Sequence, residues 1–143
     1  MKKDFSEKVE EMSGVMRLGI QSVDLQHEKF YKLLEELRLY ASIQEDEIHF
    51  RSILTELEEY AVYHFINEER LMRENNYPEY EEHLIQHQLF SQKLQEFGNA
   101  LDYGNRLVNQ QMVMFFQRWF VHHVCGLDKL AVEYIQQHNN DDE

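Results

Sequence analysis

The sequence contains few of the residues on which small secreted or all-β proteins depend. It has one cysteine, Cys125, one proline and five glycines in 143 residues. A single cysteine excludes an intramolecular disulfide, so nothing ties the chain to an oxidising compartment. So few Pro and Gly residues provide too few tight turns for an all-β fold, and they favour long helices.

Basic residues are also scarce. Lys and Arg number 14 against 27 Asp and Glu, which gives a formal net charge of −13. Nucleic acids and anionic membrane surfaces bind clustered cations, so both are excluded as partners. No apolar run approaches the roughly 20 residues of a membrane span. The N-terminal segment becomes acidic after two lysines and does not resemble a signal peptide. We therefore expect a cytoplasmic protein.

What is present is a helical pattern that occurs four times. Residues 1–18 are mixed in character and are expected to form an N-terminal arm with one or two helical turns. Apolar residues then recur every three or four positions, the spacing of one helix face. The four predicted inner faces are Val23, His27, Phe30, Leu34 and Leu37; Phe50, Ile53, Leu54, Leu57, Ala61, His64, Phe65, Glu68 and Met72; Tyr80, His83, Leu84, His87, Phe90, Leu94 and Phe97; and Val108, Met112, Phe115, Trp119, His123, Leu127, Leu130 and Tyr134.

Short polar segments separate these faces, at residues 42–47, 75–78 and 98–105. Ser22 is the predicted N-cap of the first helix, and Pro78 suits the first turn of the third. The sequence therefore predicts an all-α protein, an up-down-up-down four-helix bundle with an N-terminal arm. We expect one domain over residues 1–143, with the arm at 1–18, the bundle at 19–138 and a polar tail at 139–143.

Histidines interrupt the apolar faces. Five of the eight histidines and one glutamate occupy core-facing positions, and all four helices contribute: His27, His64, His83, His87, His123 and Glu68. Burying such groups without partners costs several kcal/mol for each ionised group. A metal ion removes that cost, because neutral imidazole and ionised carboxylate are then ligands. A lone core histidine is more often a hydrogen-bonded core residue, so the prediction depends on the whole set.

The spacing of these residues supports a metal site. His64 and Glu68 are four residues apart, as are His83 and His87. Residues four apart lie on the same helix face, so each pair can point at one centre. His123 and Asp128 are five apart, which separates them by about 140° on an ideal helix. They can converge only if the Asp128 side chain reaches around the helix or if the helix carries a wide turn such as a π-bulge, which Gly126 makes less costly.

Four segments resemble the bacterial hemerythrins in motif, spacing and order. They are GIQSVDLQHEKF at residues 19–30, HFINEERLM at 64–72, NYPEYEEHLIQHQLF at 76–90 and WFVHHVCGLD at 119–128. The resemblance extends from about Gly19 to Tyr134. It implies a non-haem di-iron centre of two oxygen-bridged iron ions. By this resemblance one iron is bound by His27 and His64, the other by His83, His87 and His123, and the bridging carboxylates are Glu68 and Asp128.

The resemblance also implies a function. Five imidazoles, two bridging carboxylates and a bridging oxygen leave one coordination position vacant, on the iron with two histidines. Reversible dioxygen binding there, for storage, delivery or buffering, is the implied role, and we expect no enzymatic activity. Apolar residues next to the ligands are expected to line the O2 pocket and exclude water: Phe30, Phe65, Trp119, Phe120 and Val124. Outside the ligand set we expect Cys125, as a packed residue, and His49, His122 and His138.

Other functions remain open. Sensing of O2, redox state or nitric oxide through a separate partner would use the same site. A di-iron oxidase or peroxidase is less consistent, because ferritin-like bundles use ExxH motifs and no histidine here has a glutamate three residues before it. Weak peroxidase or nitric oxide chemistry remains an alternative. A bundle that only contacts other proteins, or that binds zinc, would leave five core histidines in register unexplained.

Overall fold

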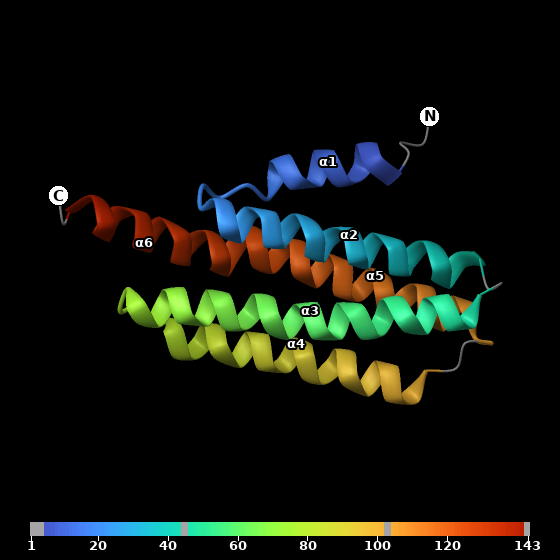
Figure 1. Ribbon diagram of the computed structural model, residues 1–143. Coiled ribbons are helices and arrows are strands. Elements are labelled where there is room, and N and C mark those ends of the chain that lie inside the picture. Colours follow the sequence, from blue (N-terminus) through green and yellow to red (C-terminus); the bar gives the residue numbers. More distant parts are fainter. Residues whose placement is uncertain (1–4, 44–45, 102–103, 142–143) are drawn as a thin grey trace.

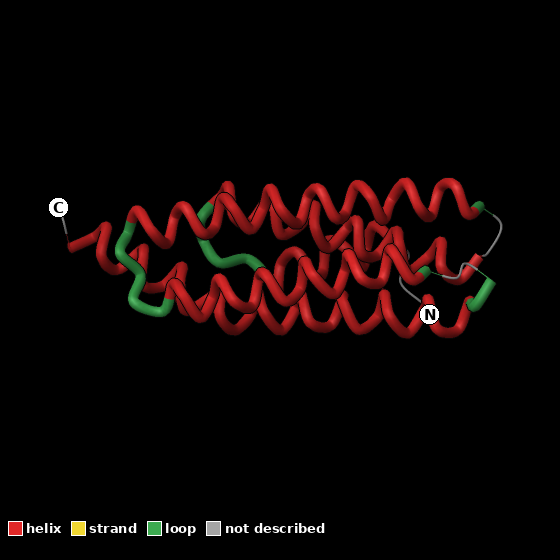
Figure 2. Tube along the Cα trace, turned by 90° about the horizontal axis from the view of Figure 1, so that it is seen from below, coloured by secondary structure: helices red, strands yellow, loops and turns green. Residues whose placement is uncertain are grey.

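A computed structural model describes residues 5–43, 46–101 and 104–141 of the chain. The helices are α1 (Phe5–Val15), α2 (Gln21–Ile43), α3 (Glu47–Glu74), α4 (Tyr80–Ala100), α5 (Arg106–His123), the π-helix η1 (Val124–Asp128) and α6 (Lys129–Asp141). The last three follow one another as a single rod, which alternates in direction with α2, α3 and α4 (Figure 1). The loop between α3 and α4 lies at one end of this bundle, and the described parts of the other two connections between its helices lie at the opposite end (Figure 2). The predicted all-α four-helix bundle with an N-terminal arm is confirmed.

The core lies along the axis of the bundle. α2 packs along α3 and α5, and α3 packs along α4, whereas α4 and α5 pack against each other less closely than these three pairs. All nine residues predicted for the inner face of α3 are buried. Within the described residues, no helix combines the length and the hydropathy of a membrane-spanning segment.

The inner face of α5 and α6 differs from the prediction. Val108, Phe115 and Leu130 were expected inside, but they are 47%, 45% and 56% exposed. The buried residues of α5 and η1 are instead Asn109, Val113, Phe116, Phe120, His123, Val124 and Asp128. Apolar residues occur in adjacent pairs in α5, such as Phe115 and Phe116. The sequence therefore allows two inner faces that differ by one residue, and both include His123. Only one residue of each pair can face the core.

The start of α2 also differs from the prediction. Ser22 lies inside the helix and is not its N-cap. The carboxylate of Asp24 instead accepts hydrogen bonds from the backbone N–H groups of Leu18, at 2.8 Å, and Gly19, at 3.0 Å. Gly19 has a φ of +108°, in the left-handed region that glycine favours. Asp24 and Gly19 together therefore define the turn that leads into α2.

Other boundaries shift by a few residues. Pro78 lies in the turn before α4, which begins at Tyr80, and not in the helix. α4 continues through Gly98 to Ala100, and α6 continues beyond residue 138 to Asp141. Part of the predicted connection, residues 102–103, and the last two residues of the predicted tail lie outside the described residues.

The N-terminal arm is a longer helix than expected. Val9 and Met16 of this segment are buried in the core, and Met12 packs against it. Lys8 Nζ lies 3.3 Å from the carboxylate of the buried Glu35, which also accepts a hydrogen bond of 2.6 Å from Gln117 Nε2 of α5. This apolar face and this ion pair hold α1 against the bundle.

Candidate metal centre

The seven predicted ligands meet inside the bundle, and none is more than 6% exposed. Their donor atoms form two groups, each with all atoms within 4.8 Å of one another. The two-histidine group contains His27, from α2, and His64, from α3. The three-histidine group contains His83, His87 and His123, from α4 and α5. Glu68 of α3 and Asp128 of η1 belong to both groups.

In the three-histidine group, the ring nitrogens face one another. His123 Nε2 lies 3.0 Å from His83 Nε2 and 3.2 Å from His87 Nε2. One N–H cannot donate to both neighbours, so hydrogen bonds among the rings cannot satisfy all three nitrogens. Donors bound at about 2.1 Å in neighbouring octahedral positions lie about 3 Å apart. The three imidazoles are therefore spaced to hold one metal ion.

Asp128 lies between the two groups. Its Oδ1 is 2.7 Å from His83 Nε2 and 3.1 Å from His123 Nε2, whereas its Oδ2 is 3.1 Å from His27 Nε2. The two oxygens of one carboxylate thus face opposite groups. This is the placement that a carboxylate bridging two ions requires.

Glu68 also contacts both groups. Its Oε1 lies 3.2 Å from His64 Nε2 and 3.4 Å from His87 Nε2, and its Oε2 lies 3.3 Å from His27 Nε2. Despite these short distances, His64 Nε2, Glu68 Oε1 and Asp128 Oδ2 are buried without hydrogen-bond geometry. Buried polar atoms without such bonds are costly and rare. The lone pairs of these three atoms point into the centre without accepting hydrogen bonds, an arrangement that fits the binding of metal ions there.

The charges of the centre are balanced among its own residues when metal is absent. Burial lowers the pKa of His27, but Asp128 and Glu68 outweigh burial and raise it to about 10. Burial raises the pKa of Glu68, yet His64 and His27 hold it well below its ordinary value of 4.5. The pKa of Asp128 is also lowered, because His123 and His27 outweigh its burial and the charge of Glu68. Two ionised carboxylates therefore occupy the core and require cations beside them.

The wide turn between His123 and Asp128 is confirmed. Residues 124–128 form a π-helix, and the Lys129 N–H donates to the Val124 carbonyl five residues earlier. Five residues then make up about one turn, so Asp128 returns to the face of His123. The local backbone thereby brings the last ligand into the centre.

Gly126 is not required by space, since a Cβ there would have no atom within 4 Å. Gly126→Ala should keep the π-helix and raise the free energy of unfolding by up to about 1 kcal/mol, because alanine loses less backbone entropy on folding. Denaturant unfolding of the metal-loaded proteins, together with metal analysis, measures this. A clear loss of stability or metal would mean that the turn depends on glycine.

Two aromatic residues cover the three-histidine group. Phe65 stacks on His87 with ring centroids 4.0 Å apart, and Trp119 stacks on His123 at 4.6 Å. Both were expected to line the O2 pocket, and the structure places them against this group. Stacking on both rings restricts how the imidazoles can rotate.

A second aromatic wall lies against the two-histidine group. Phe30 and Phe120 stack on each other at 4.1 Å. Phe30 meets His64 edge to face at 5.8 Å, and Phe120 meets His27 at the same distance. Val124 is also buried, at the start of η1. The predicted lining residues are thus divided between the two groups.

Two polar residues next to the centre were not anticipated. Gln26 Oε1 lies 2.9 Å from His64 Nδ1, and Glu69 Oε2 lies 2.9 Å from His87 Nδ1. Each directly adjoins a predicted ligand in the sequence, within the motifs DLQH and HFINEE. That adjacency is the signal that could have identified them. Each side chain contacts the Nδ1 atom of its histidine, which is the ring nitrogen that faces away from the centre.

The other histidines lie apart from the two groups. His49 stacks on Tyr40 and His138 stacks on Tyr134. His122 is exposed. Cys125 is also exposed, so its prediction as a packed residue is wrong; it lies on the side of η1 that faces away from the core.

Replacing His122 with alanine is expected to leave metal content unchanged and stability within about 0.5 kcal/mol, as is usual for exposed positions. Metal analysis and thermal unfolding against the unmodified protein measure both quantities. A large loss of metal would show that His122 and not His123 is the ligand.

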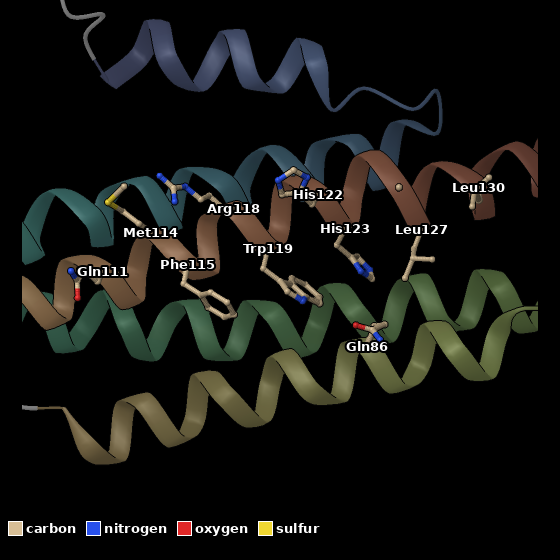
Figure 3. Close-up of a pocket in the computed structure, with 11 residues that line it drawn as sticks. Gln86, Gln111, Met114, Phe115, Arg118, Trp119, His122, His123, Leu127 and Leu130 are labelled. Carbon is tan, nitrogen blue, oxygen red and sulfur yellow. The ribbon is translucent and has the colours of Figure 1, made fainter.

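A groove of about 790 Å³ runs beside the centre. Phe115, Trp119 and Leu127 line it on the side that faces α4, which contributes Gln86 (Figure 3). His123 also borders the groove. Phe115 and Trp119, which were predicted for the inner face of the helix, therefore line a surface groove that extends to the predicted ligand His123.

The family model for the Hemerythrin HHE cation binding domain matches residues 18–135. No curated protein matches the sequence. The matched range contains all seven residues of the two groups. The chain therefore belongs to the hemerythrin family, whose shared domain binds cations.

Proposed function

We propose that this protein binds dioxygen reversibly at a di-iron centre, for storage, delivery or buffering, without enzymatic turnover. The observation that carries the proposal is the position of Asp128, whose two oxygens face two separate histidine groups. With Glu68 it would bridge two ions, each of which also has its own imidazoles. Imidazole with carboxylate suits iron, and the iron pair supplies the electrons for reversible dioxygen binding.

The composition of the donor set favours binding over oxidation. Five imidazoles, which are neutral donors when they bind a metal, accompany two carboxylates. Di-iron oxidases in ferritin-like bundles instead use carboxylate-rich sets with two Glu-x-x-His motifs. The predominance of neutral donors supports a site that takes up and releases its ligand.

The two-histidine group is the proposed place of dioxygen, because it offers one imidazole fewer than the other group. Phe30 and Phe120 cover His64 and His27 there. Their rings present carbon to the site, so they exclude water and supply no proton to a bound ligand. Both effects protect the reduced metal from irreversible oxidation.

The test is the visible spectrum of protein with a known iron content, reduced without air and cycled between O2 and argon. We expect two irons per chain and an absorption band that appears under O2 and disappears under argon through repeated cycles. Zinc-loaded protein is the control and should show no band. One-way conversion to a ferric spectrum would overturn reversible binding and favour redox sensing or peroxide chemistry at the same site.

A further inference from the structure

The two halves of the centre differ in the side chain behind one of their histidines. Behind His87 of the three-histidine group lies Glu69, a carboxylate, with Oε2 2.9 Å from Nδ1. Behind His64 of the two-histidine group lies Gln26, an amide, with Oε1 at the same distance from Nδ1. The side chain of Glu69 is only 14% exposed, so water screens its charge weakly.

The orientation of Gln26 is defined by a second donor. The Asn67 amide nitrogen donates to the same Gln26 oxygen at 3.0 Å, and Arg70 Nη2 donates to the Asn67 oxygen at 3.0 Å. Gln26 therefore presents its oxygen, not its nitrogen, to His64. The chain of contacts behind His64 ends at a cation, although Arg70 is exposed and also lies 3.9 Å from Glu74.

Both oxygens can only accept hydrogen bonds, so each imidazole carries its proton on Nδ1. This leaves the Nε2 lone pair free, and in both rings Nε2 is the atom that faces the shared carboxylate Glu68. An outer hydrogen bond of this kind fixes the tautomer and orientation of a histidine ligand. It also makes the imidazole a stronger donor when the acceptor is charged.

We propose that Glu69 and Gln26 are positioning residues that make the two metal positions electronically unequal. Glu69 strengthens His87 as a donor and favours the more highly charged metal in the three-histidine group. Gln26 orients His64 without adding negative charge, so the two-histidine group retains the lower charge. The part of this inference that concerns iron rests on the proposed function.

Exchanging the charges of these two residues tests the inference. Glu69→Gln keeps an oxygen acceptor but removes the negative charge, and Gln26→Glu adds one where two donors already converge. We expect Glu69→Gln to shift the midpoint potential of the iron-loaded centre upward and Gln26→Glu to shift it downward, as measured by spectroelectrochemical titration. Glu59→Gln is the matched control, since it removes the same charge from an exposed position on the same helix, and it should shift nothing.

A second measurement does not require iron. Glu69→Ala, which removes the acceptor, should weaken zinc binding about 10- to 100-fold in chelator competition, the usual effect of losing such a partner. Glu69→Gln should restore most of that affinity, because an amide oxygen can still orient His87. Failure to bind iron while the zinc series follows this order would overturn the proposed function but not the positioning roles.

If Glu69→Gln and Gln26→Glu load iron normally and have the same midpoint potential as the unmodified protein and the Glu59→Gln control, the inference is overturned. The proposed function would then still stand. Equal zinc affinity in Glu69→Ala and the unmodified protein would remove Glu69 as a positioning residue. A protein that binds neither metal would overturn both proposals.

Discussion

Replacing Asp128 with alanine should remove most of the metal from the centre. Its two oxygens lie 2.7 to 3.1 Å from imidazole nitrogens of both groups. Without them, the two groups share only Glu68, and His83 and His123 lose their carboxylate partner. We expect iron per chain, measured after anaerobic loading, to fall from two to well below one. Glu68→Ala should have a similar effect, because Glu68 also contacts both groups.

Loss of folding must be separated from loss of ligands in this experiment. Circular dichroism of the variant should retain the helical spectrum, since the core of the bundle is built largely from other residues. His122→Ala, next to a ligand but outside both groups, is the matched control. Retention of both irons with unchanged dioxygen binding in Asp128→Ala would contradict the bridging assignment.

Removing the metal should lower the melting temperature by on the order of 10 °C. A ligand present at about 1,000 times its Kd stabilises the folded state by about 4 kcal/mol, and about 2 to 4 °C accompany each kcal/mol in a domain of this size. The donor set is buried and is completed by metal only in the folded state. Thermal unfolding of the loaded and the metal-free protein measures the difference.

The metal-free protein should also lose stability at alkaline pH. The pKa of His27 rises from 6.5 to about 10 on folding, so its stabilising proton is fully present below pH 6.5 and is lost as the pH rises toward 10. Glu68 has the opposite pH dependence, because its pKa is lowered on folding. Its ionised carboxylate stabilises the fold above the ordinary pKa of 4.5, and this stabilisation is lost as the solution becomes more acidic.

The melting temperature of metal-free protein should therefore fall between pH 6.5 and 10. The loaded protein should show a much smaller fall over this range, since its imidazoles are already deprotonated by the metal. Equal melting temperatures with and without metal, or parallel pH profiles, would contradict a centre that couples to folding.

The sequence is a good guide where polar and apolar residues alternate with a single period. α3 is such a helix, and its predicted inner face, including His64 and Glu68, matches the structure residue for residue. α5 is not, because Phe115 and Phe116 are neighbours and hydrophobicity cannot select between them. Packing makes that choice: Phe116 contacts Phe90 and Phe97 of α4 and is buried, whereas Phe115 is exposed.

The outer residues of the centre depend on information that periodicity does not contain. Gln26 and Glu69 lie beside the inner faces of their helices, where a polar residue is ordinary. Their role appears only when the rings of His64 and His87 are oriented in three dimensions. The length of α1 was also underestimated, because its stability comes from Glu35 and the core, which lie far away in the sequence.

The π-helix η1 amounts to one extra residue inserted into an otherwise regular rod. Up to His123 the buried positions follow one helical register. From Asp128 onward they follow a register shifted by one residue. Deleting a residue such as the exposed Cys125 would return the segment to an ordinary α-helix, with Asp128 then four positions after His123. The wide turn and the five-residue spacing are thus matched to each other, because an ordinary α-helix would need a spacing of four residues to place both ligands on one face.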